Sequence, residues 1–403
     1  MRTLVAALLL FSTTALRADA VRILDDPREA VQARVDLIQQ AQKKINLLYF
    51  LARDDRITLG MLALLRDARR RGVGDVRVIV DGSFHRIPKA VLAHLGDEGV
   101  EVRVYHPLDL RHPSWMFHRM HEKVITADAA RYITGGRNLA ESYFGLARKR
   151  NFLDRDVYVD GPSAADADAH FEQLWASRHV AKLHVRVSAA AKRQAAQTLG
   201  DKLEEMRCSG LIDLGTERDW SAGREETAGV RFIADDVGDA VGASLRGAKE
   251  SIVIESPYFV PPRFVRELLL EKLAAGVRVV VLTNSVRSTD GLLPQVAYLE
   301  YRGELARAGV DFREYKGPDI LHAKSIVVDG RVAMIGSYNI DPRSHYLNRE
   351  VMCVADDEDL ARELLESIEV HLDNAWTIGH APAAPTLRAW AVRLLLPFIE
   401  HQL

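Results

Sequence analysis

Two segments of the chain carry the residue types that acid–base and phosphoryl chemistry need, in the same order and at the same spacing. Both obey the pattern H-x-K-x4-D-x6-G-[GS]-x-N, and the second copy begins 201 residues after the first. The copies are His121, Lys123, Asp128 and Asn138, and His322, Lys324, Asp329 and Asn339. A pattern of this length, present twice in one chain, indicates a duplicated catalytic motif.

The spacing within each motif indicates which side chains act together. The stretches VITAD and SIVVD, which follow the motif lysines, are rich in β-branched residues and predict strands. His and Lys at i and i+2 then share one face of the strand, whereas an Asp seven residues after the His leaves that face. We therefore expect Asp128 and Asp329 to organise strand ends within the catalytic motif.

An approximate twofold relation between the copies would bring two His, two Lys and two Asn into one pocket. Two lysines and two amide groups can bind a phosphate diester and stabilise charge that develops on its oxygens. One imidazole can attack phosphorus while the other protonates the leaving alcohol. The motifs therefore predict catalytic roles for His121 and His322, with phosphate binding by Asn138 and Asn339.

A nucleophilic imidazole needs its second ring nitrogen held, often by a carboxylate. Two acids occur in similar contexts, Asp156 in LDRDV and Glu350 in LNREV, 35 and 28 residues after their histidines. We expect Asp156 and Glu350 to orient the imidazoles. The alternative is that each acid pairs with a neighbouring arginine on the surface.

The sequence gives little support to metal chemistry. His118 and His121 form H-x-x-H, but no third ligand stands near them. Two cysteines in 403 residues exclude a disulfide scaffold and a Cys-based zinc site. We expect no metal and no cofactor.

Short β-branched runs alternate with helical stretches, which predicts an α/β fold with helices layered on a sheet. Residues 76–80 and 100–104 are expected strands, and 61–72 is an expected helix. A repeat of long period, with LLYFLARDD echoed by VIESPYFVPP, predicts two similar halves. The expected organisation is a first half over 21–184, a linker or helical insertion over 185–229, and a second half over 230–380.

Both ends of the chain suggest contact with a membrane. Arg2, an apolar run over 4–16 and Ala18-Asp19-Ala20 are typical of a secretory signal peptide over residues 1–20, the alternative being an uncleaved anchor. The C-terminal segment 381–403 contains an apolar stretch that either lies on a membrane surface or packs on its domain. We expect an exported, membrane-associated protein, either at the periplasmic face of the inner membrane or secreted.

The two motifs resemble those of the phospholipase D superfamily, and further segments are similar to bacterial cardiolipin synthases. These segments are GGRNLAESYF, SPYFVPP, LTNSVRSTD, residues 298–302 and GSYNIDPRSHYLNRE. The resemblance implies two phospholipase D-like α/β sandwich halves related by a pseudo-twofold, with the active site at their interface. It also implies a phosphatidyl-histidine intermediate on His121, His322 as general acid, no metal, and membrane phospholipids as substrates.

Two positions depart from the family pattern. Gly136 stands where Ser is commoner, and Gln295-Val296-Ala297 stands where His-Ala-Gly is expected, which leaves the choice of acceptor open.

The sequence therefore predicts a phosphatidyltransferase that forms cardiolipin from phosphatidylglycerol and a second phospholipid. One alternative is hydrolysis through the same intermediate, which would release phosphatidic acid or cleave nucleic-acid diesters. Another is a non-catalytic lipid-binding module, although intact motifs in both halves argue against it. The 54 basic residues are balanced by 56 acidic ones and no aromatic–basic stripe is present, so no nucleic-acid partner is expected. The oligomeric state is left open.

Overall fold

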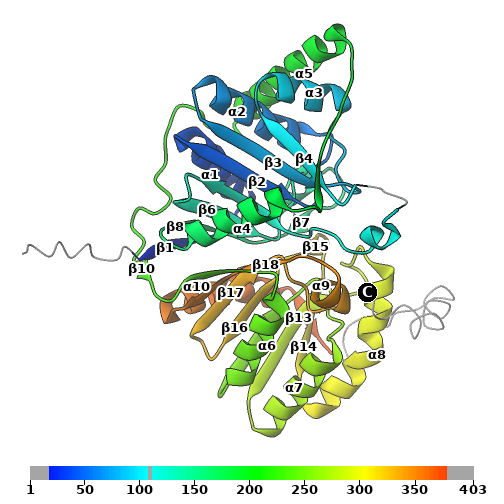
Figure 1. Cartoon of the computed structure of the whole chain (residues 1–403). Helices are drawn as coiled ribbons and strands as arrows, with labels where there is room; N and C mark the ends of the chain where they lie inside the picture. Colours follow the sequence, from blue (N-terminus) through cyan, green and yellow to red (C-terminus); the bar gives the residue numbers. More distant parts are fainter. Residues whose placement is uncertain (1–17, 108–110, 379–403) are drawn as a thin grey trace, which may run out of the picture.

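Two large mixed sheets lie one above the other in the computed structural model, which describes residues 18–107 and 111–378 (Figure 1). The described chain begins at residue 18, so the expected signal segment over residues 1–20 lies almost entirely outside it. The expected C-terminal tail over 381–403 lies wholly outside it. Among the residues described, no helix is both long and apolar enough to cross a bilayer.

The first sheet has the strand order β10-β1-β8-β6-β5-β2-β3-β4-β9. Its β2, β3 and β4 run parallel, and the remaining neighbours are antiparallel. The strands are β1 (Asp19–Leu24), β2 (Lys44–Tyr49), β3 (Asp75–Asp81), β4 (Glu101–Tyr105), β5 (Lys123–Ala127), β6 (Arg131–Gly135), β8 (Asp156–Asp160), β9 (Val180–Lys182) and β10 (Glu226–Thr227).

The second sheet repeats this plan in the order β11-β18-β17-β16-β12-β13-β14-β19. Its parallel strands are β12, β13 and β14, which match β2, β3 and β4 of the first sheet. The strands are β11 (Arg231–Ala234), β12 (Ser251–Glu255), β13 (Arg278–Asn284), β14 (Asp311–Tyr315), β16 (Ser325–Val328), β17 (Val332–Gly336), β18 (Val351–Asp356) and β19 (Ala375–Thr377).

Helices cover the outer faces of both sheets (Figure 1). On the first sheet these are α1 (Pro27–Gln40), α2 (Arg56–Arg70) and α3 (Lys89–Asp97), and on the second α6 (Val237–Gly247), α7 (Arg263–Ala274) and α8 (Leu292–Ala308). The sequence-expected strands at 76–80 and 100–104 and the helix at 61–72 are confirmed by β3, β4 and α2. The duplicated α/β organisation is confirmed as well.

The inner faces of the two sheets share one apolar core. Two further helices, α4 (Ala164–Ala176) and α10 (Glu358–Asp373), supply side chains to this core from between the sheets. Helix α4 contacts β11 of the second sheet, and α10 contacts β1 of the first. Because burial of apolar surface is the main favourable term in folding, this shared core holds the halves together.

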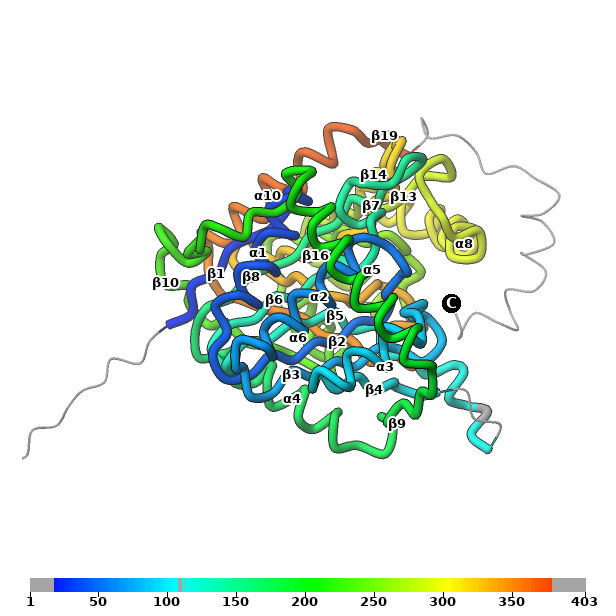
Figure 2. Tube along the Cα trace, turned by 90° about the horizontal axis from the view of Figure 1, so that it is seen from above, coloured from blue at the N-terminus to red at the C-terminus, as the bar shows by residue number. Residues whose placement is uncertain are grey.

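The segment between the halves, residues 185–229, contains α5 (Ala189–Cys208) and an extended return to the sheets. Helix α5 packs on α2 and α3 of the first half, as Figure 2 shows from above. Beyond it, Trp220 donates to the Asp36 carboxylate at 2.8 Å, and β10 pairs with β1. The sequence suggested a linker or helical insertion here; the segment holds helix α5 and also supplies strand β10 to the first sheet.

Candidate active site

Each motif histidine stands just before a central strand of its sheet. His121 is followed by Lys123, the first residue of β5, and His322 by Lys324, which directly precedes β16. All four side chains are buried. Strands β5 and β16 run antiparallel to β2 and β12, so both histidines lie at the carboxyl ends of the parallel strands.

The backbone on either side of the histidines is fixed by the opposite half of the chain. The residue before His121, Met120, forms a parallel bridge with Arg349, and the N–H of His121 donates to the Arg349 carbonyl oxygen at 2.9 Å. In the same way β15 (Ile320–Leu321) pairs with β7 (Phe152–Leu153), and the N–H of His322 donates to the Leu153 carbonyl oxygen at 2.7 Å. The site therefore lies where short segments of the two halves pair in parallel.

Each imidazole contacts a carboxylate from the opposite half. The Nδ1 atom of His121 lies 3.0 Å from both carboxylate oxygens of Glu350, and the Nδ1 atom of His322 lies 2.5 Å from Oδ2 of Asp154. A carboxylate at Nδ1 fixes the ring orientation and places the proton on that nitrogen, which leaves Nε2 as the reactive atom. Each orienting carboxylate therefore comes from the half opposite its histidine, whereas the sequence predicted an orienting acid in the same half as each histidine.

The register of the sheets makes Asp154 and Glu350 equivalent. The motif glycine that ends β6 pairs with Asp156, and the equivalent glycine that ends β17 pairs with Met352. Asp154 and Glu350 each lie two residues before these partners. Aligning LDRDV with LNREV by their letters therefore selects an acid two residues too late in the first half.

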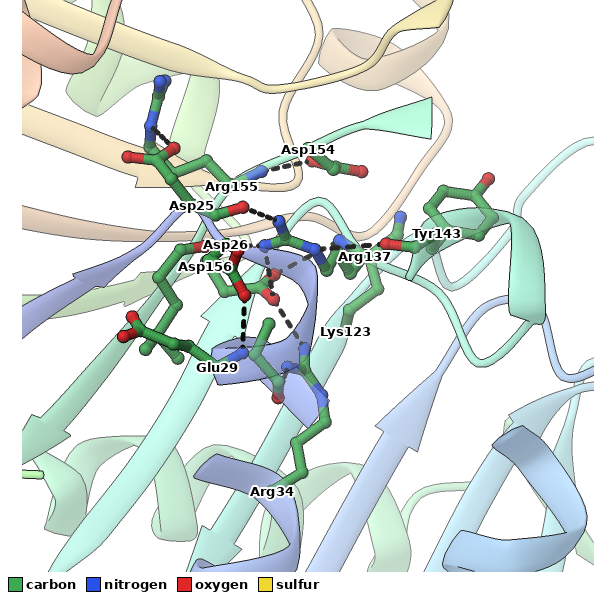
Figure 3. Close-up of polar contacts among 12 residues, drawn as sticks. Asp25, Asp26, Glu29, Arg34, Lys123, Arg137, Tyr143, Asp154, Arg155 and Asp156 are labelled. Carbon is green, nitrogen blue, oxygen red and sulfur yellow. Dashed lines mark hydrogen bonds and ion pairs between the residues drawn. The ribbon is translucent and has the colours of Figure 1, made fainter. Parts of the chain in front are cut away.

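Asp156 corrects the sequence expectation, because its carboxylate contacts arginines of its own half and no histidine. Oδ2 accepts from Arg34 at 2.8 Å and from Arg137 at 3.1 Å (Figure 3). All three side chains are buried, so the contact is not the surface pair that was the alternative. Asp156 ties α1 to the strand ends beneath the site, and Asp154 takes the position beside His322.

The departure at Gly136 follows from the place of Asp154. A Cβ atom on Gly136 would lie 1.9 Å from Asp154 Oδ1, so a side chain at this position would force the Asp154 carboxylate to move. In the second half Ser337 occupies the equivalent position and donates to Glu350 Oε2 at 2.5 Å. Gly136 therefore leaves open the space that the Asp154 carboxylate occupies beside His322.

The two motif lysines add positive charge to the pocket. The Nζ atoms of Lys123 and Lys324 donate to the carbonyl oxygens of His121 and His322, and Lys324 Nζ also lies 2.8 and 3.1 Å from the two ring nitrogens of His322. Burial lowers the pKa of Lys123 to about 7 and that of Lys324 to about 8. An anion entering the pocket would restore both charges.

Burial also favours the neutral form of the two imidazoles. It lowers the pKa of His121 to about 4 against the opposing effect of Glu350, and it lowers the pKa of His322 together with the charge of Lys324. The charge of Lys324 also acts on His121, and that of Lys123 on His322, so the four groups form one electrostatic unit. A neutral imidazole has the free lone pair that a nucleophile needs.

The two motif asparagines are buried but differ in their partners. Oδ1 of Asn138 accepts the backbone N–H of Leu51 at 3.1 Å. Oδ1 of Asn339 is buried and has no hydrogen-bond partner among the described residues, while the Asn339 backbone N–H donates to Ser344 Oγ at 3.3 Å. Because buried polar atoms are normally bonded, this acceptor oxygen is available to a donor of the substrate, such as a hydroxyl group.

The motif aspartates lie at the opposite ends of their strands from the histidines. The Asp128 carboxylate accepts the backbone N–H groups of Gln42, Lys43 and Lys44 at 2.7–2.9 Å. Asp329 accepts those of residues 249–251 in the same way, and both aspartates have positive φ, 57° and 53°. These contacts hold the starts of β2 and β12, which is the strand-end arrangement that their spacing suggested.

Aromatic rings contact both imidazoles and were not identified from the sequence. Phe50 meets His121 edge-on at 4.9 Å between ring centroids, and Tyr143 and Phe152 meet His322 at 5.3 and 5.1 Å. Such rings restrict the imidazoles and keep water from their faces. Phe50 follows β2 directly, so its place after a buried parallel strand is the signal that could have marked it.

Two arginines of the LDRDV and LNREV segments also cross between the halves. Arg155 is fully buried, contacts Glu255 and donates to Ser325 Oγ at 2.8 Å in the second half. Arg349 donates to Glu122 at 3.2 Å in the first half, where Glu122 also pairs with His170 at 2.9 Å. Buried charges need partners of this kind, so these contacts fix the relative position of the halves.

The described residues contain no group of three or more His, Cys, Asp or Glu side chains placed to hold a metal ion. The H-x-x-H pair does not converge, because His118 is exposed and its Nδ1 bonds the Ser114 carbonyl oxygen at 3.0 Å, whereas His121 is buried against Glu350.

The family described as cardiolipin synthase, PLD-like domain, matches residues 35–175 and 242–372, one stretch in each half. The chain belongs to this family. The resemblance drawn from the two motifs is thereby confirmed, and with it the class of enzyme, a phospholipid phosphatidyltransferase.

Relatives of this PLD-like protein cover most of its length. Cardiolipin synthase C of Escherichia coli is 28% identical over 88% of this chain and 85% of its own. An uncharacterized protein of Helicobacter pylori is 27% identical over 89% and 80%. The crystal structure of phosphatidylserine synthase from Haemophilus influenzae superposes with a TM-score of 0.73 at 14% identity, over 96% of this chain and 97% of that one. This likeness confirms the predicted fold class.

Proposed function

We propose that this PLD-like protein forms cardiolipin by transferring a phosphatidyl group from phosphatidylglycerol to a hydroxyl of a second phospholipid. The observation that carries the proposal is the pair of buried imidazoles, each held at Nδ1 by an acid of the opposite half. Two imidazoles held in this way can carry the phosphatidyl group and the proton in turn, and membership of the cardiolipin synthase family supports a lipid hydroxyl as the acceptor.

In the first step Nε2 of His121 attacks the phosphorus of the donor. A P–N bond forms and the P–O bond to the glycerol headgroup breaks. His322 enters this step as an imidazolium paired with the Asp154 carboxylate, gives its Nε2 proton to the leaving oxygen and becomes neutral. Lys123, Lys324 and the NH2 group of the Asn339 amide donate to the non-bridging oxygens, whose negative charge grows during the displacement. The product of this step is a phosphatidyl group on His121.

In the second step His322 takes the proton of the acceptor hydroxyl as its oxygen attacks phosphorus. The P–N bond breaks and His121 returns to its neutral form, so the enzyme ends the cycle unchanged. The closer carboxylate contact of His322, 2.5 Å against 3.0 Å for His121, supports its role as the group that carries the proton between the steps.

Analysis of the lipid products tests this proposal. The purified enzyme is incubated with vesicles of phosphatidylglycerol, with and without phosphatidylethanolamine, and the products are identified by mass spectrometry. We expect cardiolipin from the wild type and no turnover from His121→Ala or His322→Ala, with both variants folded by circular dichroism. Phosphatidic acid as the sole product would instead establish a hydrolase, and turnover by either variant would exclude the two-histidine mechanism.

The proposal extends to location. The signal-like residues 1–20 support export, with action at the outer surface of the cytoplasmic membrane. A reporter enzyme that is active only outside the cytoplasm, fused after residue 378, tests this. Activity of the fusion supports export, and an inactive, stable fusion contradicts it.

A further inference from the structure

Large apolar side chains exposed on the described surface gather at one end of the molecule. Of seven such residues, six lie on four segments at the end of the sheets where β7 and β15 lead into the site. We call these six the apolar rim: Phe84, Met116, Phe117, Leu292, Leu293 and Tyr346, exposed by 38%, 56%, 41%, 47%, 39% and 58%. The seventh, Val370 on α10, lies outside the rim and lines a hollow together with Asp25, Phe152, Asp154 and Ser367.

The first-half part of the rim is connected to His121 by direct contacts. The ring of Phe84 lies 4.3 Å from that of Phe50, which in turn lies 4.9 Å from the His121 imidazole. Met116 ends the short helix η1 (Pro113–Met116), drawn in cyan at the right of Figure 1, and Phe117 follows it. Phe84 is therefore one ring away from the His121 imidazole, and Met116 and Phe117 lie on the segment that leads into the first motif.

Helix η1 is held firmly despite its exposed tip. Trp115 stacks on His106 with ring centroids 4.5 Å apart, and His106 Nε2 bonds His179 Nδ1 at 2.8 Å. Arg119 donates to the Trp115 carbonyl oxygen at 2.7 Å and pairs with the buried carboxylate of Asp81. Met116 and Phe117 therefore stay exposed at the end of a well-packed segment, although exposure of large apolar groups is unfavourable in water.

The second half supplies the rest of the apolar rim. Leu292 and Leu293 begin α8, two residues after Asp290, whose carboxylate accepts the Tyr258 hydroxyl at 2.7 Å. Tyr346 ends α9 (Pro342–Tyr346), a few residues after the second motif. Figure 1 shows η1 and the start of α8 projecting from the same end of the two sheets.

Basic side chains stand beside this rim. Residues 145–151, GLARKRN, which we call the basic loop, carry Arg148 and Lys149 as exposed cations. Arg150 ties the loop to the segment before α8, because it donates to the carbonyl oxygens of Arg287 and Thr289 at 3.3 and 3.4 Å. Arg86 and Lys89, both exposed, follow Phe84 on the other side.

The opposite end of the molecule is acidic. A hollow between β10 and the start of α10 is lined by more carboxylates than cations, namely Glu225, Glu226, Asp357, Asp359, Glu363 and Glu366 against Arg224 and Arg362. The net charge of −2 therefore conceals a separation of charge between the two ends. An anionic surface would attract the end that carries the rim and repel the far end.

We propose that the apolar rim and the basic loop dock the enzyme on a bilayer that contains anionic phospholipid. This rests on the proposed function, since a bilayer lipid is the substrate. The rim side chains enter the boundary between headgroups and acyl chains, and Arg148 and Lys149 pair with lipid phosphates. Docking in this orientation lets a headgroup reach His121 while its acyl chains stay in the membrane.

Vesicle binding by full-length variants tests the docking surface. The variants are Met116→Asp/Phe117→Asp, Leu292→Asp/Leu293→Asp and Arg148→Gln/Lys149→Gln, with Val370→Asp as the matched control. Sedimentation with vesicles of phosphatidylglycerol and phosphatidylethanolamine measures binding. Each double variant should bind about tenfold more weakly than wild type, and Val370→Asp should bind as wild type does.

A second assay separates docking from chemistry. Short-chain phosphatidylglycerol below its critical micelle concentration needs no membrane, so the rim variants should consume it at the wild-type rate and lose turnover only on vesicles. A wild type that consumes neither substrate yet binds vesicles through the rim would refute the proposed function and leave docking intact. Unchanged vesicle binding by the rim variants, an equal loss with Val370→Asp, or equal binding of wild type to neutral phosphatidylcholine vesicles would each overturn the docking proposal.

Discussion

Each motif histidine contacts an acid of the opposite half, and contacts of this kind determine which ring nitrogen carries the proton. With Nδ1 bound by Glu350 or Asp154, the Nε2 atoms are free to act on the substrate. The neighbouring Asp156 has a different task, since it binds Arg34 and Arg137 inside the first half. Two acids separated by one residue therefore serve chemistry and stability respectively.

These separate roles predict that two isosteric substitutions impair different properties of the enzyme. Asp154→Asn should lower kcat about 10²–10⁴-fold with little change in the free energy of unfolding, because the amide cannot stabilise a protonated His322. Asp156→Asn should lower the free energy of unfolding by about 3–5 kcal/mol, because it unbalances two buried guanidinium groups. Steady-state kinetics and denaturant unfolding of both proteins measure the difference. A loss of kcat in folded Asp156→Asn equal to that in Asp154→Asn would contradict the assignment.

The lysines make the reaction sensitive to pH. Burial lowers the pKa of Lys123 to about 7 and that of Lys324 to about 8 in the free enzyme, so both ammonium charges are lost as the pH rises through this range. Because an anionic diester needs these charges, kcat/KM should fall as pH rises through 7 to 8. His121, with its pKa lowered to about 4, stays neutral throughout.

The pH profile of kcat/KM between 6 and 9 measures this effect. Lys123→Arg is the control, since a guanidinium keeps its charge and should remove the lower inflection while reducing the overall rate. A flat profile in the wild type would show that the lysines stay charged before substrate binds.

At the scale of elements, the ends of β6 and β17 differ in a way that matches their acids. Gly136 follows β6 and leaves room for Asp154, whereas Ser337 follows β17 and bonds Glu350. Local matching of the sequence identified the motifs and the role of Asp128 and Asp329, because strand alternation depends only on neighbours. It missed the equivalence of Asp154 and Glu350, because that depends on the register between β6 and β8, which the letters do not carry.

The strand-end pairing predicts a coupled substitution. Gly136→Ser should displace the Asp154 carboxylate from His322 and lower kcat about tenfold or more, since the new Cβ would lie 1.9 Å from Oδ1. Adding Asp154→Glu should recover part of the loss by reproducing the Ser337–Glu350 pair. Kinetics of the two single variants and the double variant form the cycle, and a double variant no better than the worse single variant would refute the coupling.

At the scale of the whole molecule, the two halves share one core between their sheets and exchange buried arginines and acids. The stretch between α5 and Trp220 contributes less, since residues 215–219 are exposed. The duplicated motif and the repeated LLYFLARDD and VIESPYFVPP segments indicated two halves, but which groups cross between them could not be predicted, because the crossing depends on how two folded surfaces meet.

Because the two halves share a core, we predict that an unbroken backbone through residues 215–219 is not needed once the protein has folded. A protease site replacing residues 215–219 should allow cleavage with retention of activity, and the two fragments should elute together in gel filtration. Mild urea that separates the fragments should abolish turnover. Loss of activity on cleavage alone, with the fragments still associated, would show that the linker itself supports the site.

Because each half supplies the acid that binds the other half's histidine, we expect the two halves to evolve together. Neither half contains a complete acid–imidazole pair, so substitution of the acid in one half changes the surroundings of the histidine in the other half. The two copies cannot drift apart independently, and a change of acid length at 154 or 350 is tied to the residue at 136 or 337. We expect related chains to show Asp with Gly and Glu with Ser as inherited pairs in each half.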